Sequence, residues 1–248
     1  MRVPRRGAPA LLAVLAACCV HAPERALAHT ATGASMHASF LPDRLGATTT
    51  LTLAFRFSGG EGGIPAPLRR MVVHLPAGLG VNLGANTSCS PARLRQSGAA
   101  GCPSGSLLGR GHALLMVHAG SQAIPEQAAL LLFRGSSRGG RATLEILSRG
   151  ETPLEESTIS TAVVEPDGAP FGLRLNVSVP AIPTLVFEPD ASFVSFSMTI
   201  GVPGRPRAHA AAAITVPRRC PAGGFPFSGD FTLSDHSTVR AATSVRCP

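Results

Sequence analysis

The most regular hydrophobic pattern of the chain runs from Thr48 to Phe57. Leucine or phenylalanine occupies every second position between 51 and 57, and threonine, alanine and arginine fill the positions between them. In an extended chain successive side chains point to opposite faces, so this alternation places the large apolar groups together on one face. The pattern predicts a half-buried strand with its threonines on the outer side.

Shorter apolar segments, separated by turns rich in glycine and proline, continue to the end of the chain. They predict further strands at 71–75, 107–117, 124–133, 142–147, 158–164, 171–179, 192–200, 211–216, 225–233 and 238–245. Residues 29–36 form either a loose arm or a first edge strand. Many short strands with almost no helix are typical of a β-sandwich, Ig-like or related, and we expect about ten strands. We expect one domain over residues 29–248, with the proline-rich stretch near 180–190 as an alternative seam.

One short helix is predicted between Cys89 and Cys102. Ser90 is a suitable cap, and Pro91 suits the first helical position because its missing N–H is not needed there. Gly98 is expected to end the helix after one to two turns. A helix this short is not stable alone, so a constraint from the flanking cysteines is expected to hold it.

The cysteines indicate an oxidising compartment. Two of the six lie in the N-terminal apolar run, which leaves four for the rest of the chain. An even number in an exported chain favours two disulfides, and four cysteines allow three connectivities. We favour the local pairs, Cys89 with Cys102 and Cys220 with Cys247, because the first closes a short loop and the second ties the terminal hairpin.

Residues 1–28 show the pattern of a secretory signal peptide. Three arginines precede an apolar run at 8–20, and Ala26-Leu27-Ala28 forms a small-x-small cleavage site. The apolar run is too short to span a bilayer, so no transmembrane segment is expected after cleavage. The alternative is a lipobox-like sequence that ends at Cys18, which predicts a lipid anchor on that cysteine. Either version places the protein in a secreted, extracellular or cell-envelope location.

The composition argues against several functional classes. The one Gly-x-Ser-x-Gly match, at 135–139, lies in the connection between the strands predicted at 124–133 and 142–147, where we expect a hairpin rather than a strand-to-helix elbow. No phosphate-binding glycine motif occurs in the sequence. Tryptophan and tyrosine are absent, although these are the residues that commonly stack on sugars and on single-stranded bases. We therefore predict no catalytic residues and no sequence-specific nucleic-acid partner.

The positive charge gives only a weak indication of a partner, because scattered charges are typical of a solvated face. The chain carries a formal net charge of +8, and its arginines are scattered rather than clustered. Such a surface favours anionic polymers without specificity. The sequence predicts a non-enzymatic, exported binding module, with an anionic envelope polymer or a protein as its partner. An exported hydrolase with an unrecognised site is the weaker alternative.

A copper site is the second functional hypothesis. Cleavage after Ala28 makes His29 the N-terminal residue, which offers an amine and an imidazole to copper, and His37 is a candidate second ligand. His112 and His118 lie about 20 Å apart along one predicted strand, so they do not share a metal ion. No other cofactor is expected.

Several longer stretches carry a resemblance. They are LPDRLGATTTLTLAF, IPAPLRRMVVHLPAGLG, the CSPARL and GCP motifs around Cys89 and Cys102, and the ending VPRRCPAGGFPF…VRCP. Together they make the chain similar to a family of secreted, disulfide-containing proteins of high-GC Gram-positive (actinobacterial-type) bacteria. The family has no established function. The resemblance implies export, a β-rich fold and the two local disulfides, and it carries over no catalytic or binding residue.

Overall fold

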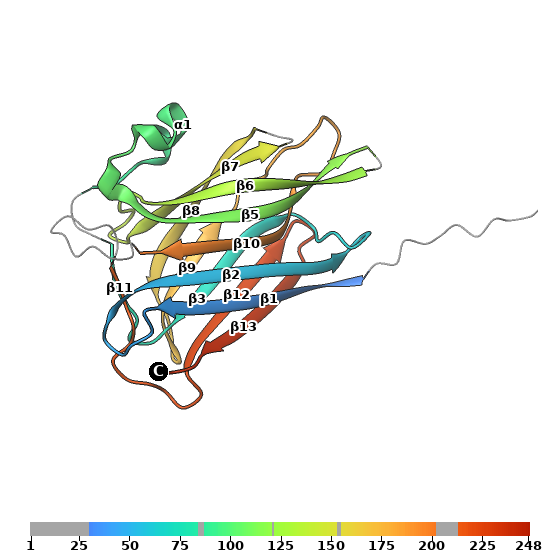
Figure 1. Cartoon of the computed structure of the whole chain (residues 1–248). Helices are drawn as coiled ribbons and strands as arrows, with labels where there is room; N and C mark the ends of the chain where they lie inside the picture. Colours follow the sequence, from blue (N-terminus) through green and yellow to red (C-terminus); the bar gives the residue numbers. More distant parts are fainter. Residues whose placement is uncertain (1–29, 84–86, 121, 153–154, 202–212) are drawn as a thin grey trace, which may run out of the picture.

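The computed structural model describes residues 30–83, 87–120, 122–152, 155–201 and 213–248 (Figure 1). The strands in these ranges are β1 (Thr30–Leu41), β2 (Thr48–Gly60), β3 (Leu68–Pro76), β4 (Gly80–Asn82), β5 (Leu107–Ala119), β6 (Gln122–Arg134), β7 (Thr143–Thr152), β8 (Ser157–Pro166), β9 (Phe171–Ser178), β10 (Ser192–Ile200), β11 (Ala213–Thr215), β12 (Phe225–Leu233) and β13 (Thr238–Val245). The helical elements there are α1 (Pro91–Ser97) and the 3-10 turns η1 (Ala99–Gly101) and η2 (Ser104–Ser106). The predicted all-β class with one short helix is confirmed.

All thirteen strands belong to one antiparallel sheet in the described part of the chain. Its order is β13-β12-β3-β9-β8-β7-β6-β5-β10-β2-β11-β4, and β1 pairs with β2 beside this path. Strand β1 also contacts β13, at the other end of the order. The sheet therefore folds over on itself, and Figure 1 shows β1, β2, β5 and β10 in front of the obliquely running β9, β12 and β13. The predicted sandwich-like fold is confirmed, with both layers supplied by one continuous sheet.

The core fills the space between the two layers. The leucines and phenylalanines of β2 point inward and are at most 4% exposed, as the alternation predicts. Phe55 and Phe57 both meet the ring of Phe231 edge-on, with centroid distances of 5.2 and 4.9 Å. Gly229 makes room for this cluster, because a Cβ there would lie 2.7 Å from the ring of Phe231. Aromatic packing across the layers therefore fixes β2 against β12.

The C-terminal hairpin consists of β12 and β13. Their register runs from Phe225 opposite Val245 to Thr232 opposite Thr238. The predicted disulfide between Cys220 and Cys247 closes this hairpin at its open end. In the loop-entropy model such a bridge stabilises the fold by about 2–4 kcal/mol. The hairpin is also held laterally, because β12 pairs with β3.

Helix α1 begins and ends as the sequence predicts. The hydroxyl of Ser90 accepts a hydrogen bond from the backbone N–H of Arg93 at 3.2 Å, and Pro91 is the first helical residue. Gly98 follows the helix with a φ of 57°, a left-handed value that glycine adopts without strain. The predicted disulfide between Cys89 and Cys102 closes the loop that contains α1.

Two predictions concern the ends and the division of the chain. The predicted signal peptide, including Cys18, lies outside the described residues, so its cleavage or lipidation stays a prediction. Across the described ranges, no helix is long and apolar enough to cross a membrane. Residues 179–191, which contain the alternative seam near 180–190, connect β9 to β10, and both are strands of the same sheet. The single-domain organisation stays a prediction.

Candidate functional site

The outer face of β5 to β8 carries two neighbouring rows of side chains. In the first row the strand register places Arg110 opposite Leu131, which is opposite Leu147. Ile159 of β8 continues this row beyond Leu147. In the second row Arg149 of β7 lies opposite Ala129 of β6. The register thus surrounds a strip of apolar side chains with arginines from different strands.

Helix α1 covers one end of this strip. Leu94 of α1 is 2% exposed and packs in a small apolar cluster with Cys89, Phe133 and Leu147. Between the helix and the strands lies a groove of about 820 Å³, which we call the α1 groove. Its floor is apolar and includes Leu131 and the half-buried Ile159. The disulfide loop therefore forms one wall of an open groove rather than a closed cap.

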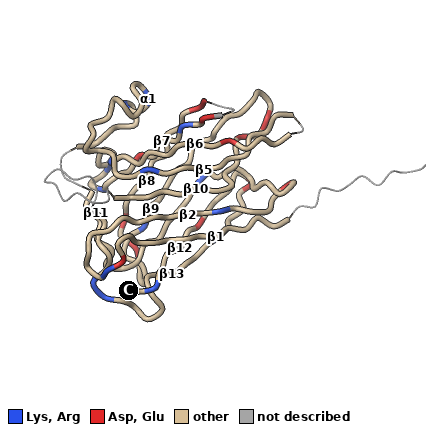
Figure 2. Tube along the Cα trace, viewed as in Figure 1, with Lys and Arg blue, Asp and Glu red and all other residues tan. Residues whose placement is uncertain are grey.

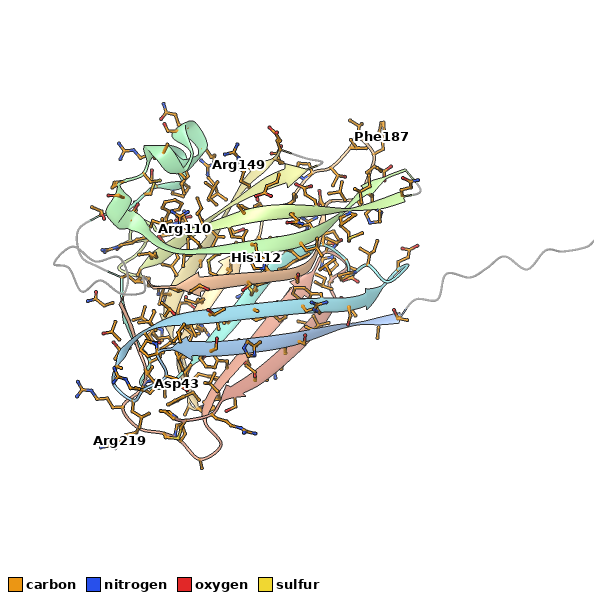
Figure 3. All side chains as sticks on the ribbon, viewed as in Figure 1. Asp43, Arg110, His112, Arg149, Phe187 and Arg219 are labelled. Carbon is orange, nitrogen blue, oxygen red and sulfur yellow. A yellow bond between two sulfur atoms is a disulfide. The ribbon has the colours of Figure 1, made fainter. Side chains whose placement is uncertain are left out.

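Arginines from three elements line the α1 groove. Arg95 comes from α1, Arg110 from β5 and Arg149 from β7, and all three are exposed. Figure 3 shows Arg110 and Arg149 on either side of β6, on the side where α1 lies. Within the described ranges, neither Arg110 nor Arg149 forms an ion pair. Glu155 is the one carboxylate among the lining residues, so positive charge prevails in the groove.

A buried carboxylate lies next to the groove, beneath the disulfide loop. Glu145 is 1% exposed, and its carboxylate accepts hydrogen bonds from the hydroxyls of Thr161 at 2.6 Å and Thr143 at 3.4 Å. Burial raises the pKa of Glu145, while the two hydroxyls and the charges of Arg138 and Arg95 act in the opposite direction. Part of the charge of Arg95 is therefore balanced by Glu145, unlike the charges of the two strand arginines.

A second polar cluster lies on the far part of the outer face. The Nδ1 atom of His74 lies 2.5 Å from Asp167, and its Nε2 atom lies 3.2 Å from Asp230. Arg240 donates to both oxygens of Asp230, at 2.5 and 3.2 Å. Because both ring nitrogens of His74 face carboxylates, neither is free to act as a general base. The cluster links β3 and β12 to the connection that follows β8.

The neighbouring groups in this cluster lower the pKa of two carboxyl groups, those of Asp230 and Asp167. Hydrogen bonds from Arg240 are the largest cause of the lowered pKa of Asp230, and the bond with His74 adds to them against the effect of burial. Burial alone would raise the pKa of Asp167. Hydrogen bonds with His74 and a backbone amide, together with nearby positive charge, outweigh burial and lower it.

The structure describes one of the two predicted copper ligands. His29 lies outside the described residues. His37 is exposed on β1 and shares a row with His112, but β2 and β10 lie between their strands. Three strand spacings put the two histidines about 14 Å apart. Among the described residues, no three histidine, cysteine, aspartate or glutamate side chains group in a way that suits a metal ion. The copper hypothesis stays a prediction.

Sequence reasoning missed the groove because its arginines are far apart along the chain. Figure 2 shows basic positions spread over several strands and α1 rather than gathered in one run. Arg95, Arg110 and Arg149 meet only through strand register and the disulfide loop. The signal in the sequence was the wholly apolar 129–133 stretch, whose outward positions need cover or a ligand.

No family model, no curated protein and no solved structure matches this chain. The family suggested by the sequence motifs therefore stays a prediction, and any function has to be argued from the geometry of the site.

Proposed function

We propose that the protein is exported and acts as a non-enzymatic binding module in or outside the cell envelope. Its α1 groove binds an anionic envelope component that carries an apolar segment. The observation that carries this proposal is the strip of half-buried apolar side chains, Leu131 and Ile159, bordered by Arg110 and Arg149. Neither arginine has an ion-pair partner in the described structure. The two disulfides support export, since such bonds persist in oxidising compartments.

The arginines favour a phosphate or carboxylate group. A guanidinium presents a planar fork of N–H donors that matches the oxygens of both anions, and charged hydrogen bonds are stronger than neutral ones. Arg110 and Arg149 come from β5 and β7, which flank β6, so one anionic group above β6 is within the reach of both long side chains. Two arginines on rigid strands give the site its preference for anions.

The apolar floor favours a ligand that is more than a simple anion. Leu131 and Ile159 are only partly buried, so an alkyl chain placed over them removes further apolar surface from water. Such burial contributes roughly 25 cal/mol for each Å². Neither histidine nor cysteine lines the groove within the described ranges, which supports binding rather than catalysis.

Calorimetric titration tests this proposal with three ligands that share one chain length. Octyl phosphate, octyl glucoside and octyltrimethylammonium are added below their micelle concentrations to the full-length protein at low salt. We expect octyl phosphate to bind most tightly. R110Q/R149Q should weaken it about tenfold or more, because two charged hydrogen-bond donors are lost.

Arg56 provides the matched control. It is an exposed arginine on β2, outside the groove, so R56Q removes the same kind of charge from the same sheet without changing the site. R56Q should leave the affinity for octyl phosphate within about twofold of the original value, apart from long-range electrostatics that salt screens. Equal binding of all three ligands, or equal losses in both variants, would overturn the proposal.

A further inference from the structure

A second hollow lies inside the molecule, between the two layers of the sheet. It offers about 90 Å³ for the centres of water-sized groups. Its walls are apolar side chains such as Phe55, Leu130 and Phe196. One water molecule needs roughly 10–15 Å³ of such space, so the cavity has room for a short alkyl chain. The cavity is separate from the α1 groove, which lies on the outer face.

The polar groups of this cavity gather at one end. Its polar lining consists of Ser148 on β7 and Thr158 and Ser160 on β8, and the register places Ser148 opposite Thr158. A smaller hollow of about 10 Å³ shares Ser148 and Thr158 with the cavity and is also lined by the buried Glu126 and the exposed Glu156. The apolar cavity and the small pocket therefore share a wall that carries hydroxyl oxygens.

Glu126 is the unusual residue of this pocket. It is 6% exposed and points inward from β6 on the same side as Ala128, Leu130 and Leu132. In the described part of the chain it has no hydrogen-bond or ion-pair partner. Burial raises its pKa. Burial disfavours the charged form of this carboxylate, and a cation placed beside it would favour that form.

The residues around Glu126 determine which kind of ligand would complement its carboxylate in charge and hydrogen bonding. The lining residues of the cavity and of the pocket include no arginine, lysine or histidine in the described ranges. The pocket offers the carboxylate of Glu126 together with hydroxyl oxygens that accept hydrogen bonds. A group with several N–H donors and a positive charge complements this set, whereas an anionic group would be repelled.

We infer that this interior site binds a small alkylammonium molecule. Its alkyl chain occupies the apolar cavity, and its ammonium group donates hydrogen bonds to Glu126 and to the hydroxyls of Ser148 and Thr158. The ammonium supplies the charge partner that Glu126 lacks, and the chain fills space that is otherwise empty. This site does not depend on the function proposed for the α1 groove.

Methyl NMR of the full-length protein, with methionine methyl groups labelled, tests the inference. Met71 and Met198 line the cavity, whereas Met116 of β5 does not. Hexylammonium, hexanol and hexanoate serve as probes of equal chain length. We expect hexylammonium to shift the Met71 and Met198 signals and to bind about tenfold or more tightly than hexanol.

The variant E126Q keeps the shape of the side chain and removes its charge. It should weaken hexylammonium about tenfold while leaving hexanol unchanged, and the exposed Glu61 gives the control variant E61Q. Each variant is folded when its methionine methyl spectrum, recorded without ligand, matches that of the wild type. Equal affinities of hexylammonium and hexanol, an equal loss of both in E126Q, or no shift at Met71 and Met198 would each overturn the inference.

Discussion

The Nε2 atom of His74 in β3 lies 3.2 Å from a carboxylate oxygen of Asp230 in β12. The other ring nitrogen meets Asp167 in the connection between β8 and β9. One imidazole therefore joins three segments that are far apart along the chain. Because carboxylates only accept hydrogen bonds, His74 makes both contacts at once when both ring nitrogens donate.

Replacing His74 by alanine should lower the free energy of unfolding. It should also reduce the amount by which that free energy falls in acid. The free energy of unfolding at pH 7 should fall by about 1–2 kcal/mol, because two carboxylates lose a partner. The pKa of both Asp167 and Asp230 is lowered in the folded protein from 3.8, so their contribution is present above that pH and is lost as the pH falls below it. Urea unfolding at several pH values measures both effects.

H112A is the matched control for that prediction. His112 is exposed on β5, and the described structure gives it no hydrogen bond or ion pair. Its replacement should change stability by less than about 0.5 kcal/mol at every pH. If H74A and H112A unfolded alike, the cross-link through His74 would contribute nothing to the fold.

The free protein should become more stable at neutral pH when Glu126 is replaced by glutamine. Because burial raises the pKa of Glu126 above 4.5, the folded state holds its proton more tightly than the unfolded state. Stability therefore falls as the pH rises from 4.5 through the folded pKa, and E126Q removes this loss. We expect a gain of about 1 kcal/mol at pH 7 and none at pH 4. A gain of the same size at both pH values would contradict this explanation.

Phe187 and Phe231 should respond in opposite ways to substitution. Phe187 is 103% exposed and has a φ of 69°, whereas Phe231 is 0% exposed. F187N places a residue that tolerates left-handed backbone at a strained position and should stabilise the protein by up to about 1 kcal/mol. F231A should destabilise it by about 3–5 kcal/mol. Thermal unfolding of the two variants measures the difference, and a destabilised F187N would show that Phe187 is not strained.

Removing the two disulfides one at a time should affect different properties: loss of the first weakens binding, and loss of the second lowers stability. C89A/C102A releases the seven-residue helix α1, which is too short to persist alone, and should weaken octyl phosphate about tenfold. C220A/C247A should lower the unfolding free energy by about 2–4 kcal/mol and leave the affinity unchanged. Calorimetric titration and thermal unfolding of both variants supply the comparison. Loss of binding in C220A/C247A at a temperature where it is folded would place the ligand elsewhere.

Local features of the fold were readable from the sequence because local forces determine them. Strand β2 follows its alternation, α1 follows the cap at Ser90 and the stop at Gly98, and both disulfides join cysteines close in the chain. Strand β10 lacks a regular alternation because its register against β5 shifts between Phe193 and Ser195, which breaks the period of two. The three-residue strand β4 was missed because it is too short to show a period.

The candidate site was not readable because it depends on strand order. Nothing in the sequence states that Arg110 and Arg149 lie on the two neighbours of one strand, or that Leu131 lies between them. The inward position of Glu126 is implied by the alternation after it, but its lack of a partner depends on which strands surround it. Sequence patterns indicate which face a side chain takes, and tertiary packing decides its neighbours.

The most direct test of the proposed function locates the bound chain itself. Intermolecular nuclear Overhauser effects between octyl phosphate and methyl-labelled protein report which side chains touch the alkyl group. The account predicts such effects at Leu131, Leu147 and Ile159, the floor of the α1 groove, and their loss in R110Q/R149Q at the same ligand concentration. Effects confined to other methyl groups, or effects at the floor that persist undiminished in R110Q/R149Q, would contradict it.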